Sequence, residues 1–497
     1  MRALRLLAAV AGLVLAAPAA AQAPSGGDAA FARLDPIFER FARERHAPGV
    51  VFGVVADGKL VYVKAMGVQD TAAKRPVTPD SVFRIASMSK NFTALAVLKL
   101  RDEGKLSLDA PVEAIVPELA GLAYPTTDSR KVRVRDLLNH VGGFVTDDPW
   151  GDRQLDVSEA AFSAFLKNGV PFARAPGLTM EYSNFGYALA GRVVTNTSGQ
   201  PFDAYIGQQI LAPLGMRAST YDVGQIPAAR RAVGYDWIDG RWVEEPVLGP
   251  GVYGAMGGLA VSANDYAKYV AWVLDAWPAR DGADDPILKR SSRREIVEGS
   301  NFPAVVTRAD KADGCDRARA YGMGMIVYAD CVLGPHFTHS GGLPGYGSNV
   351  IFLPERGLGI FAFANMTYAG AAPYVREAAI ELVNSGAFPP RVAPPGQNLA
   401  GAVQALSRAY AASDVMTVRE TWAMNVLLDS DAAHRNAELA QLKAELGACR
   451  DAESFTADSA MSAQVEFPCE RGRLRAHVLL APTTPATIQS YELVAVK

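Results

Sequence analysis

Ser87 and Lys90 stand three residues apart at the head of an apolar run that extends over Phe83–Leu100. Such a run predicts a buried helix that begins near Ser87. Because residues i and i+3 lie on one face of a helix, we expect the hydroxyl of Ser87 to meet the amine of Lys90. A serine becomes an effective nucleophile once a neighbouring base accepts its proton, and burial lowers the pKa of a lysine toward the value that this task needs. The spacing therefore indicates acyl transfer through a serine nucleophile.

Two further motifs follow along the chain. Tyr182 is the only one of 17 tyrosines with an asparagine, Asn184, two residues later, and an apolar helical pattern begins directly after it. His339 is the only one of six histidines that begins an H-S-G sequence, and it stands in a strand-like segment beside glycines. About one S-x-x-K is expected by chance in a chain of this length. The three motifs in this order instead indicate residues that meet in one site.

In these motifs the sequence resembles the serine β-lactamase/penicillin-binding protein superfamily. It is most similar to the branch that holds class C β-lactamases, D-aminopeptidases, DD-peptidases and esterases. The resemblance covers about residues 29–385 and rests on the segments F-R-I-A-S-M-S-K, L-L-N-H-V-G-G, Y-S-N-F-G-Y, G-G-L-A-V-S-A-N-D and H-S-G-G-L-P-G-Y. It implies a fold and a set of catalytic roles, which are expectations at this point.

The resemblance implies a role for each matching residue. Ser87 would form an acyl-enzyme, and Lys90 would accept or relay its proton. Tyr182, held near Lys90, would protonate the leaving group and activate the deacylating water; its phenolate would need cationic neighbours to be populated near neutral pH. Asn184 would orient Lys90 and bind the amide of the substrate. The backbone N–H groups of Ser87 and Gly342 would form the oxyanion hole, where two fixed donors contribute several kcal/mol.

At His339 the chain departs from the family pattern. β-Lactamases and many DD-peptidases have a lysine there, in K-T-G or K-S-G, and its permanent positive charge faces the carboxylate of a β-lactam or of a peptide C-terminus. A histidine is mostly neutral at pH 7, so we expect weaker recognition of a carboxylate. Ser340 keeps the hydroxyl of the family motif. By resemblance, H-x-G is met in aminopeptidase, endopeptidase and esterase-like members.

The sequence therefore predicts an exported serine hydrolase that acts through an acyl-enzyme on amide or ester bonds, with a D-residue peptide or a small ester as substrate. Two alternatives stay open: a class C-like β-lactamase that hydrolyses β-lactams, and a non-catalytic penicillin-binding-type sensor of cell-wall fragments. The intact Ser, Lys, Tyr and Asn of the motifs argue against the sensor. A lipase-type α/β-hydrolase is disfavoured because the sequence contains no G-x-S-x-G.

The order of helix-like and strand-like segments predicts how these motifs are positioned. A helix is expected over Ala29–Arg45, and an antiparallel pair over Gly49–Gly67 turns at Asp57-Gly58. A helix over Tyr374–Ser385 follows four late strands, at Met323–Tyr328, Phe337–His339, Ser348–Leu353 and Gly359–Ala364. We expect an α/β (α+β) fold, of the β-lactamase/transpeptidase type by resemblance. Early and late strands would share one antiparallel sheet flanked by helices, with an inserted helical lobe in the middle of the chain and the site in the cleft between them.

The N-terminal segment has the composition of a signal peptide. Arg2 and Arg5 precede a short apolar stretch, Leu6–Ala17, and the small residues Ala19–Ala21 follow it. We expect residues 1–21 to be a signal peptide, cleaved before Gln22. The mature protein is then expected to be periplasmic or secreted, with no membrane span after cleavage.

Three segments are expected after the signal peptide. A β-lactamase-like serine hydrolase domain would occupy residues 28–386, and a proline-rich linker residues 387–398. Residues 399–497 are expected to form a small accessory α+β domain of unknown role. The four cysteines fall into two local pairs. Of three possible connectivities we favour Cys315–Cys331 and Cys449–Cys469, because each closes a short loop within one expected domain.

The composition and the motifs bear on the partners and cofactors that we expect. With 49 Lys and Arg against 52 Asp and Glu, the net charge is −3, so nothing indicates binding to nucleic acid. We expect a small-molecule or peptide substrate and no cofactor. No metal site is expected, since neither C-x-x-C nor H-E-x-x-H occurs. The sequence leaves the oligomeric state open.

Overall fold

The computed structural model describes residues 27–148, 150–299, 301, 304–306 and 317–496. Within them, a nine-stranded sheet has the order β3-β2-β1-β13-β12-β11-β10-β9-β8, and its neighbouring strands pair antiparallel. Its strands are β1 (Gly49–Ala56), β2 (Lys59–Asp70), β3 (Arg75–Pro76), β8 (Ala304–Val306), β9 (Arg317–Tyr321), β10 (Ile326–Asp330), β11 (Gly334–Leu343), β12 (Tyr346–Leu353) and β13 (Leu358–Ala364). The prediction that early and late strands share one antiparallel sheet is confirmed.

The strand β1 lies inside this sheet, between β2 and β13. All eight of its residues are buried, which suits an apolar strand with helices on both faces of its sheet. The hairpin from β1 to β2 turns at Asp57 and Gly58, which have φ of 47° and 75°. A two-residue hairpin turn of type I′ needs positive φ at both positions, and Asp-Gly adopts it readily. The predicted hairpin is confirmed.

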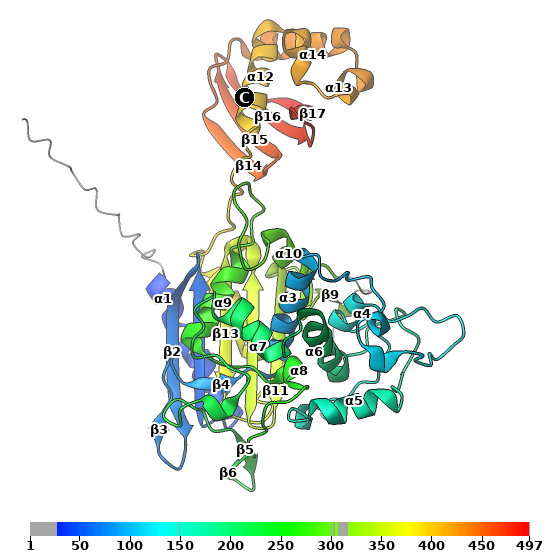
Figure 1. Ribbon diagram of the computed structural model, residues 1–497. Coiled ribbons are helices and arrows are strands. Elements are labelled where there is room, and N and C mark those ends of the chain that lie inside the picture. The colour runs from blue at the N-terminus through cyan, green and yellow to red at the C-terminus, as the bar shows by residue number, and fades with distance from the viewer. Residues whose placement is uncertain (1–26, 149, 300, 302–303, 307–316, 497) are drawn as a thin grey trace, which may run out of the picture.

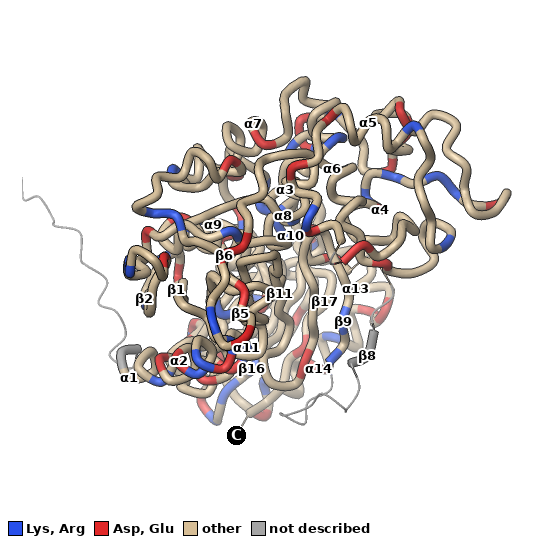
Figure 2. Tube along the Cα trace, turned by 90° about the horizontal axis from the view of Figure 1, so that it is seen from below, with Lys and Arg blue, Asp and Glu red and all other residues tan. Residues whose placement is uncertain are grey.

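Helices cover the two faces of the sheet (Figures 1 and 2). One face carries α1 (Gly27–Ala32), α2 (Asp35–Glu44) and α11 (Ala372–Asn384), and the other carries α3 (Ser89–Asp102), α6 (Asn184–Ser198), α8 (Gly254–Gly257) and α9 (Ala263–Leu274). The prediction of one helix over Ala29–Arg45 is wrong, because the chain forms α1 and α2 there instead. Pro36 lies in the first turn of α2 and has no N–H with which to continue the ladder of α1.

The middle of the chain forms the predicted helical lobe. It contains α4 (Val134–Leu138) and α5 (Glu159–Lys167), which lie beside α6 at the right of Figure 1, and α7 (Phe202–Ile206). Two short strands, β4 (Val82–Arg84) and β7 (Ala260–Ser262), pair antiparallel at its base. The chain thus leaves the sheet just before Ser87 and returns just after Gly258, which places both at the boundary between lobe and sheet.

The late strands differ from their predicted bounds. β10 begins at Ile326 and not at Met323, because Gly324 between them is left-handed with φ of 74°. β11 is longer than predicted and holds His339 in its interior. Before β7, a hairpin of β5 (Tyr235–Ile238) and β6 (Arg241–Glu244) protrudes at the bottom of Figure 1. After β7, the chain forms α9 and then α10 (Arg290–Glu295).

Residues from Leu399 onward build their own helices and sheet, drawn at the top of Figure 1. These are α12 (Leu399–Ala412), α13 (Met424–Asp429) and α14 (Ala432–Leu446), with a four-stranded sheet of β14 (Ser454–Ser459), β15 (Ser462–Cys469), β16 (Gly472–Ala481) and β17 (Thr487–Val496). Their buried apolar side chains form a cluster of their own, distinct from the clusters on the two faces of the large sheet. This α+β arrangement agrees in type with the accessory segment expected at residues 399–497.

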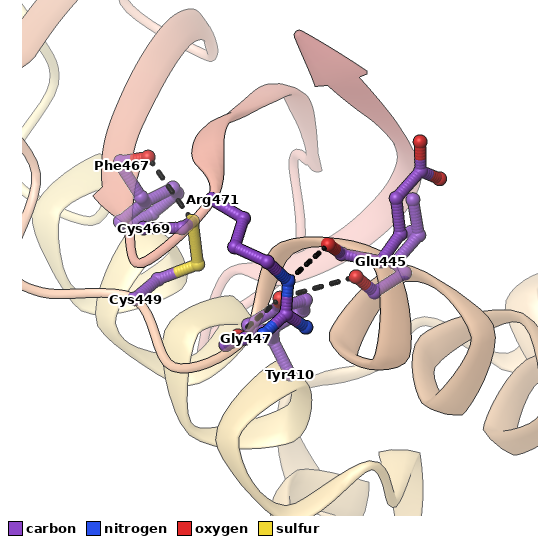
Figure 3. The surroundings of a disulfide bond; sticks show 8 residues. Tyr410, Glu445, Gly447, Cys449, Phe467, Cys469 and Arg471 are labelled. Carbon is purple, nitrogen blue, oxygen red and sulfur yellow. Dashed lines mark hydrogen bonds between the residues drawn. A yellow bond between two sulfur atoms is a disulfide. The ribbon is translucent and has the colours of Figure 1, made fainter. Parts of the chain in front are cut away.

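Cys449 and Cys469 form a disulfide bond, as predicted. It joins the segment after α14 to the end of β15 (Figure 3). Beside it, Arg471 Nε donates to the carbonyl of Glu445 at 2.8 Å, and the hydroxyl of Tyr410 donates to the carbonyl of Gly447 at 2.9 Å. These two bonds satisfy carbonyls at the end of α14. Cys331 is disulfide-bonded as well, and its predicted partner, Cys315, lies outside the described residues.

The described residues were expected to contain neither a membrane span nor a metal site. No helix in this part of the chain is long and apolar enough to cross a membrane. The same residues contain no group of three or more His, Cys, Asp or Glu side chains arranged to hold a metal ion. The predicted signal peptide, residues 1–21, lies outside the described residues.

Candidate active site

Ser87 lies on a 3₁₀ turn, Ala86–Met88, that leads directly into α3. The predicted helix is therefore present, although its α-helical part begins two residues after Ser87. Ala86 has a φ of 50°, a strained conformation for a residue with a side chain. Gly341 on β11 lies against this turn: a Cβ there would come within 2.2 Å of the Ile85 carbonyl oxygen. The glycine thus allows β11 to approach the nucleophile turn closely.

Lys90 is fully buried one turn further along, and its ammonium group has three oxygen partners. Nζ lies 3.0 Å from Ser87 Oγ, 2.7 Å from Asn184 Oδ1 and 3.1 Å from the carbonyl oxygen of Met256. Burial lowers the pKa of Lys90 to about 8, against the opposing attraction of nearby aspartates. A minor neutral fraction therefore exists near neutral pH, and that form can accept the proton of Ser87.

Tyr182 completes the group around Lys90, with its ring centroid 4.8 Å from Lys90 Nζ. It precedes α6, whose N-cap residue is Ser183, and the ring of His140 packs against it at 4.3 Å. Burial raises the pKa of Tyr182 well above its ordinary value, and a hydrogen bond with Ser87 opposes that shift only in part. The neighbouring lysine does not offset the burial, so the phenol is the stable form of Tyr182 and not the phenolate.

His339 is buried, and its two ring nitrogens have partners that define its tautomer. Nδ1 lies 2.6 Å from the carbonyl oxygen of Ser340, which can only accept, so Nδ1 carries the proton. Nε2 then accepts from the hydroxyl of Tyr321 at 2.8 Å. Burial, together with the nearby charge of Lys90, lowers the pKa of His339 to about 3. His339 is therefore a neutral imidazole at physiological pH.

Asn184 begins α6 and connects Lys90 to an acidic loop. Its Oδ1 accepts from Lys90, and its Nδ2 donates to Asp148 Oδ1, which assigns the orientation of the amide. In the same loop, the carboxylate of Asp147 accepts the backbone N–H groups of Asn184 at 2.7 Å and of Phe185 at 2.8 Å. A carboxylate at this position stabilises the start of the helix and anchors the loop to it.

The remaining predicted residues lie on β11. Ser340 is exposed, and its hydroxyl accepts from Asn349 Nδ2 at 3.0 Å. Gly342 is packed beneath the ring of Tyr368, because a Cβ at Gly342 would lie 2.5 Å from Tyr368 Cδ1. A side chain at position 342 would therefore displace the tyrosine.

A cavity of about 480 Å³ opens beside these groups, within the size range of small-molecule sites. It is lined by Ser87, Asp148, Asp152, Tyr182, Ile326, His339, Ser340, Gly341, Gly342, Tyr368 and Gly370. Lys90 and Asn184 do not line the cavity themselves but contact lining residues, Lys90 through Ser87 and Asn184 through Asp148. All seven residues predicted for the site thus meet in one place.

Four residues of the site were not predicted from the sequence: Asp148, Asp152, Tyr321 and Tyr368. The hydroxyl of Tyr368 donates to Asp152 Oδ2 at 2.8 Å, and this bond links the loop after β13 to the helical lobe. One signal was present in the sequence, since three aspartates follow the L-L-N-H-V-G-G segment closely. Tyr321 and Tyr368 stand among 17 tyrosines and carried no comparable signal.

The fold and this site are those of the class of protein that the sequence motifs resemble, and a comparison with known protein families agrees. The family model described as Beta-lactamase matches residues 34–385, which is more than half of the chain. The chain therefore belongs to the beta-lactamase family, within the serine β-lactamase/penicillin-binding protein superfamily that its motifs resemble.

Two curated relatives are similar to this chain in sequence, and two solved structures are similar to it in fold. The chain is 30% identical to Esterase EstB from Burkholderia gladioli over 300 residues, 53% of this chain and 74% of the esterase. It is 26% identical to Protein flp from Staphylococcus aureus (strain MW2) over 366 residues, 71% of this chain and 66% of that protein. An octameric penicillin-binding protein homologue from Pyrococcus abyssi has a TM-score of 0.60 at 22% identity, covering 93% of this chain and 99% of its own. A class C beta lactamase from Rhodobacter sphaeroides has a TM-score of 0.55 at 22% identity, covering 71% and 98%.

Proposed function

We propose that this protein is an exported serine hydrolase that cleaves amide or ester bonds through an acyl-enzyme. Ser87 Oγ attacks the carbonyl carbon of the substrate while its proton passes to neutral Lys90. The bond to the leaving group then breaks, and the leaving group takes up a proton by way of Tyr182. Water hydrolyses the resulting ester of Ser87 and regenerates the free enzyme. Asn184 orients Lys90, and the N–H groups of Ser87 and Gly342 stabilise the oxyanion.

The observation that carries this proposal is the contact between Lys90 and Ser87. A lysine with a pKa of about 8 lies 3.0 Å from the serine hydroxyl, within the reach that a general base needs. The opening of the cavity onto Ser87 gives a substrate carbonyl access to it. Export is supported by the composition of residues 1–21 and by the Cys449–Cys469 bond, since structural disulfides persist mainly outside the cytosol.

His339 favours amides and esters over β-lactams as substrates. A β-lactam carries a carboxylate that a permanent cation would bind, whereas His339 is neutral and both of its ring nitrogens are engaged. The class C-like β-lactamase is the second candidate, because the chain shares the fold of a class C beta lactamase. The non-catalytic sensor is the third candidate, and the intact contact between Lys90 and Ser87 argues against it.

A comparison of two chromogenic substrates tests the proposal. We expect kcat/KM for a short-chain 4-nitrophenyl ester to exceed that for a chromogenic cephalosporin by about 100-fold or more, since the cephalosporin carboxylate finds no fixed cation. Rapid cephalosporin turnover would move the β-lactamase to first place. Absence of turnover on both substrates, with the protein folded, would favour the sensor.

Replacing His339 by lysine tests the role assigned to this position. We expect His339→Lys to raise the ratio of cephalosporin to ester kcat/KM by about tenfold, because a hydrogen bond to a charged group contributes about 1.5–3 kcal/mol. Both rates and the Tm are measured for the variant and the parent protein. A ratio that stays level or falls in a folded variant means that position 339 does not decide carboxylate recognition.

A further inference from the structure

His140 lies in the active site but has no part in the proposed mechanism. It is only 3% exposed and does not line the cavity, and burial lowers the pKa of its imidazole well below the ordinary value. Its Nδ1 accepts the backbone N–H of Ser183 at 3.2 Å, so the proton of the neutral ring is on Nε2. Nε2 is buried and has no hydrogen-bond partner among the residues that the structure describes. A neutral, enclosed ring does not exchange protons with a substrate, so its effect on the reaction passes through its neighbours.

The backbone of His140 has a conformation that few residues with a side chain adopt. His140 follows α4 and its C-cap residue, Asn139, and has a φ of 60°. Glycine usually occupies this left-handed position after a helix, because it has no Cβ to strain the backbone. Strained residues persist where the surrounding structure holds them, and they cluster at functional sites. The contacts of the imidazole explain a histidine at this position, and those contacts lead to Tyr182.

His140 contacts Tyr182 and both of its neighbours in the chain. The carbonyl oxygen of His140 accepts the N–H of Glu181 at 2.8 Å, and its Nδ1 accepts the N–H of Ser183 at 3.2 Å. The imidazole packs on the phenol ring with the ring centroids 4.3 Å apart, and no other ring among the described residues lies as close to Tyr182. Ser183 is also the N-cap residue of α6. The same contacts therefore fix both the backbone and the ring of Tyr182 at the start of that helix.

We propose that His140 is the positioning residue for Tyr182 and holds its hydroxyl where it passes a proton to the leaving group. This inference rests on the proposed function, in which Tyr182 has that task. As the bond between the acyl carbon and the leaving group breaks, Tyr182 gives its phenolic proton to the leaving atom and takes up the proton that Lys90 received from Ser87. The phenol ring lies 4.8 Å from Lys90 Nζ and shares a hydrogen bond with Ser87. Proton transfer needs both heavy atoms within hydrogen-bond distance, and a displacement of about 1 Å costs about 100-fold in rate.

Two esters with the same acyl group and different leaving groups test this proposal. 4-Nitrophenyl butyrate releases a stable anion that needs no proton, whereas ethyl butyrate releases an alkoxide that does. We measure kcat/KM for both at pH 8, by nitrophenolate absorbance and by acid release. His140→Asn keeps a side-chain acceptor and tolerates the left-handed backbone but removes the ring. It should lower the ratio of ethyl ester to nitrophenyl ester kcat/KM by about tenfold or more, and Tyr182→Phe should lower the same ratio by about 100-fold.

The ratio of the two esters is the readout, because a merely structural role would lower both rates alike. His46→Asn serves as the matched control, since His46 also has a left-handed backbone, with a φ of 51°, and does not line the cavity. It should leave the ratio unchanged. Adding His140→Asn to Tyr182→Phe should lower the ratio no further, because His140 acts through the tyrosine.

An equal loss on both esters in His140→Asn, or no loss on either, would overturn the positioning role. A further fall of the ratio in the double variant would overturn it too, since His140 would then act independently of Tyr182. His140→Gly, which relieves the backbone strain, decides the question in the same way if His140→Asn does not fold. An unchanged ratio in Tyr182→Phe would mean that Tyr182 is not the proton donor, and the inference would fall while hydrolysis through Ser87 stands. Failure of the parent protein to cleave either ester would instead refute the proposed function.

Discussion

Replacing Ser87 by alanine should reduce kcat for ester hydrolysis by about 10⁴-fold or more, the largest effect that we expect from any single change. Removal of a serine nucleophile leaves only the contribution of substrate binding and of the oxyanion donors. Ser87 is the hydroxyl that Lys90 contacts at 3.0 Å, and it lies on the cavity wall. The variant should also lose covalent labelling by a serine-reactive phosphonate, which intact-mass measurement would detect as one adduct on the parent protein.

The control for this experiment is Ser107→Ala, which removes an exposed serine outside the cavity. This variant should keep both the activity and the single adduct. Labelling of Ser87→Ala at full stoichiometry would assign the nucleophile to another residue. Loss of labelling together with an unchanged rate of ester hydrolysis would mean that the reaction does not pass through Ser87.

The fold and the core of the site were predictable because they depend on local patterns. Asp57-Gly58 defines its hairpin through the backbone freedom of two residues. Ser87 and Lys90 meet because they are three residues apart on one turn and helix, and a sequence displays that spacing directly. The proline that ends the first helix, Pro36, was also visible in the sequence. The helical spacing of Phe31, Leu34 and Phe38 across it nevertheless favoured one continuous helix.

The parts of the site that escaped prediction depend on contacts between distant residues. Asp152 and Tyr368 are 216 residues apart, and only the return of the chain from the lobe to the sheet brings them together. The partner of His339 Nε2 is likewise a distant residue, Tyr321, which β9 places beside β11 by way of β10. Burial of Tyr182 could not be read from its motif either, so its phenolate remained a possibility until the surroundings were known.

The surroundings of Lys90 explain how one buried cation can serve as a base. Its nearest partners are neutral oxygens of Ser87, Asn184 and Met256, while the aspartates act on it from a greater distance. Burial thus lowers its pKa, and the surrounding negative charge limits the fall.

Replacing Lys90 by arginine should lower kcat/KM for a 4-nitrophenyl ester by about 10³-fold, within the range attributed to general base catalysis. Arginine keeps the positive charge but does not lose its proton in proteins, so it cannot accept the proton of Ser87. In the parent protein, kcat/KM should rise about tenfold per pH unit below about pH 8 and level off above it, because the neutral fraction of Lys90 follows its pKa of about 8. The residual kcat/KM of Lys90→Arg should not show this rise with pH.

Lys99→Arg is the matched control for the lysine, since Lys99 lies on the same helix and pairs with Glu103. It should preserve both the rate and the pH profile. The measurement is kcat/KM between pH 6 and 10 for the three proteins, with the Tm of each recorded. His339 and Tyr182 have pKa values displaced far from this range, in opposite directions, so a rise of kcat/KM near pH 8 reports on Lys90. A parent profile that is flat across pH 8 would therefore assign the base to a group other than Lys90. A rising limb that persists in Lys90→Arg would lead to the same conclusion, since the group that titrates would then still be present.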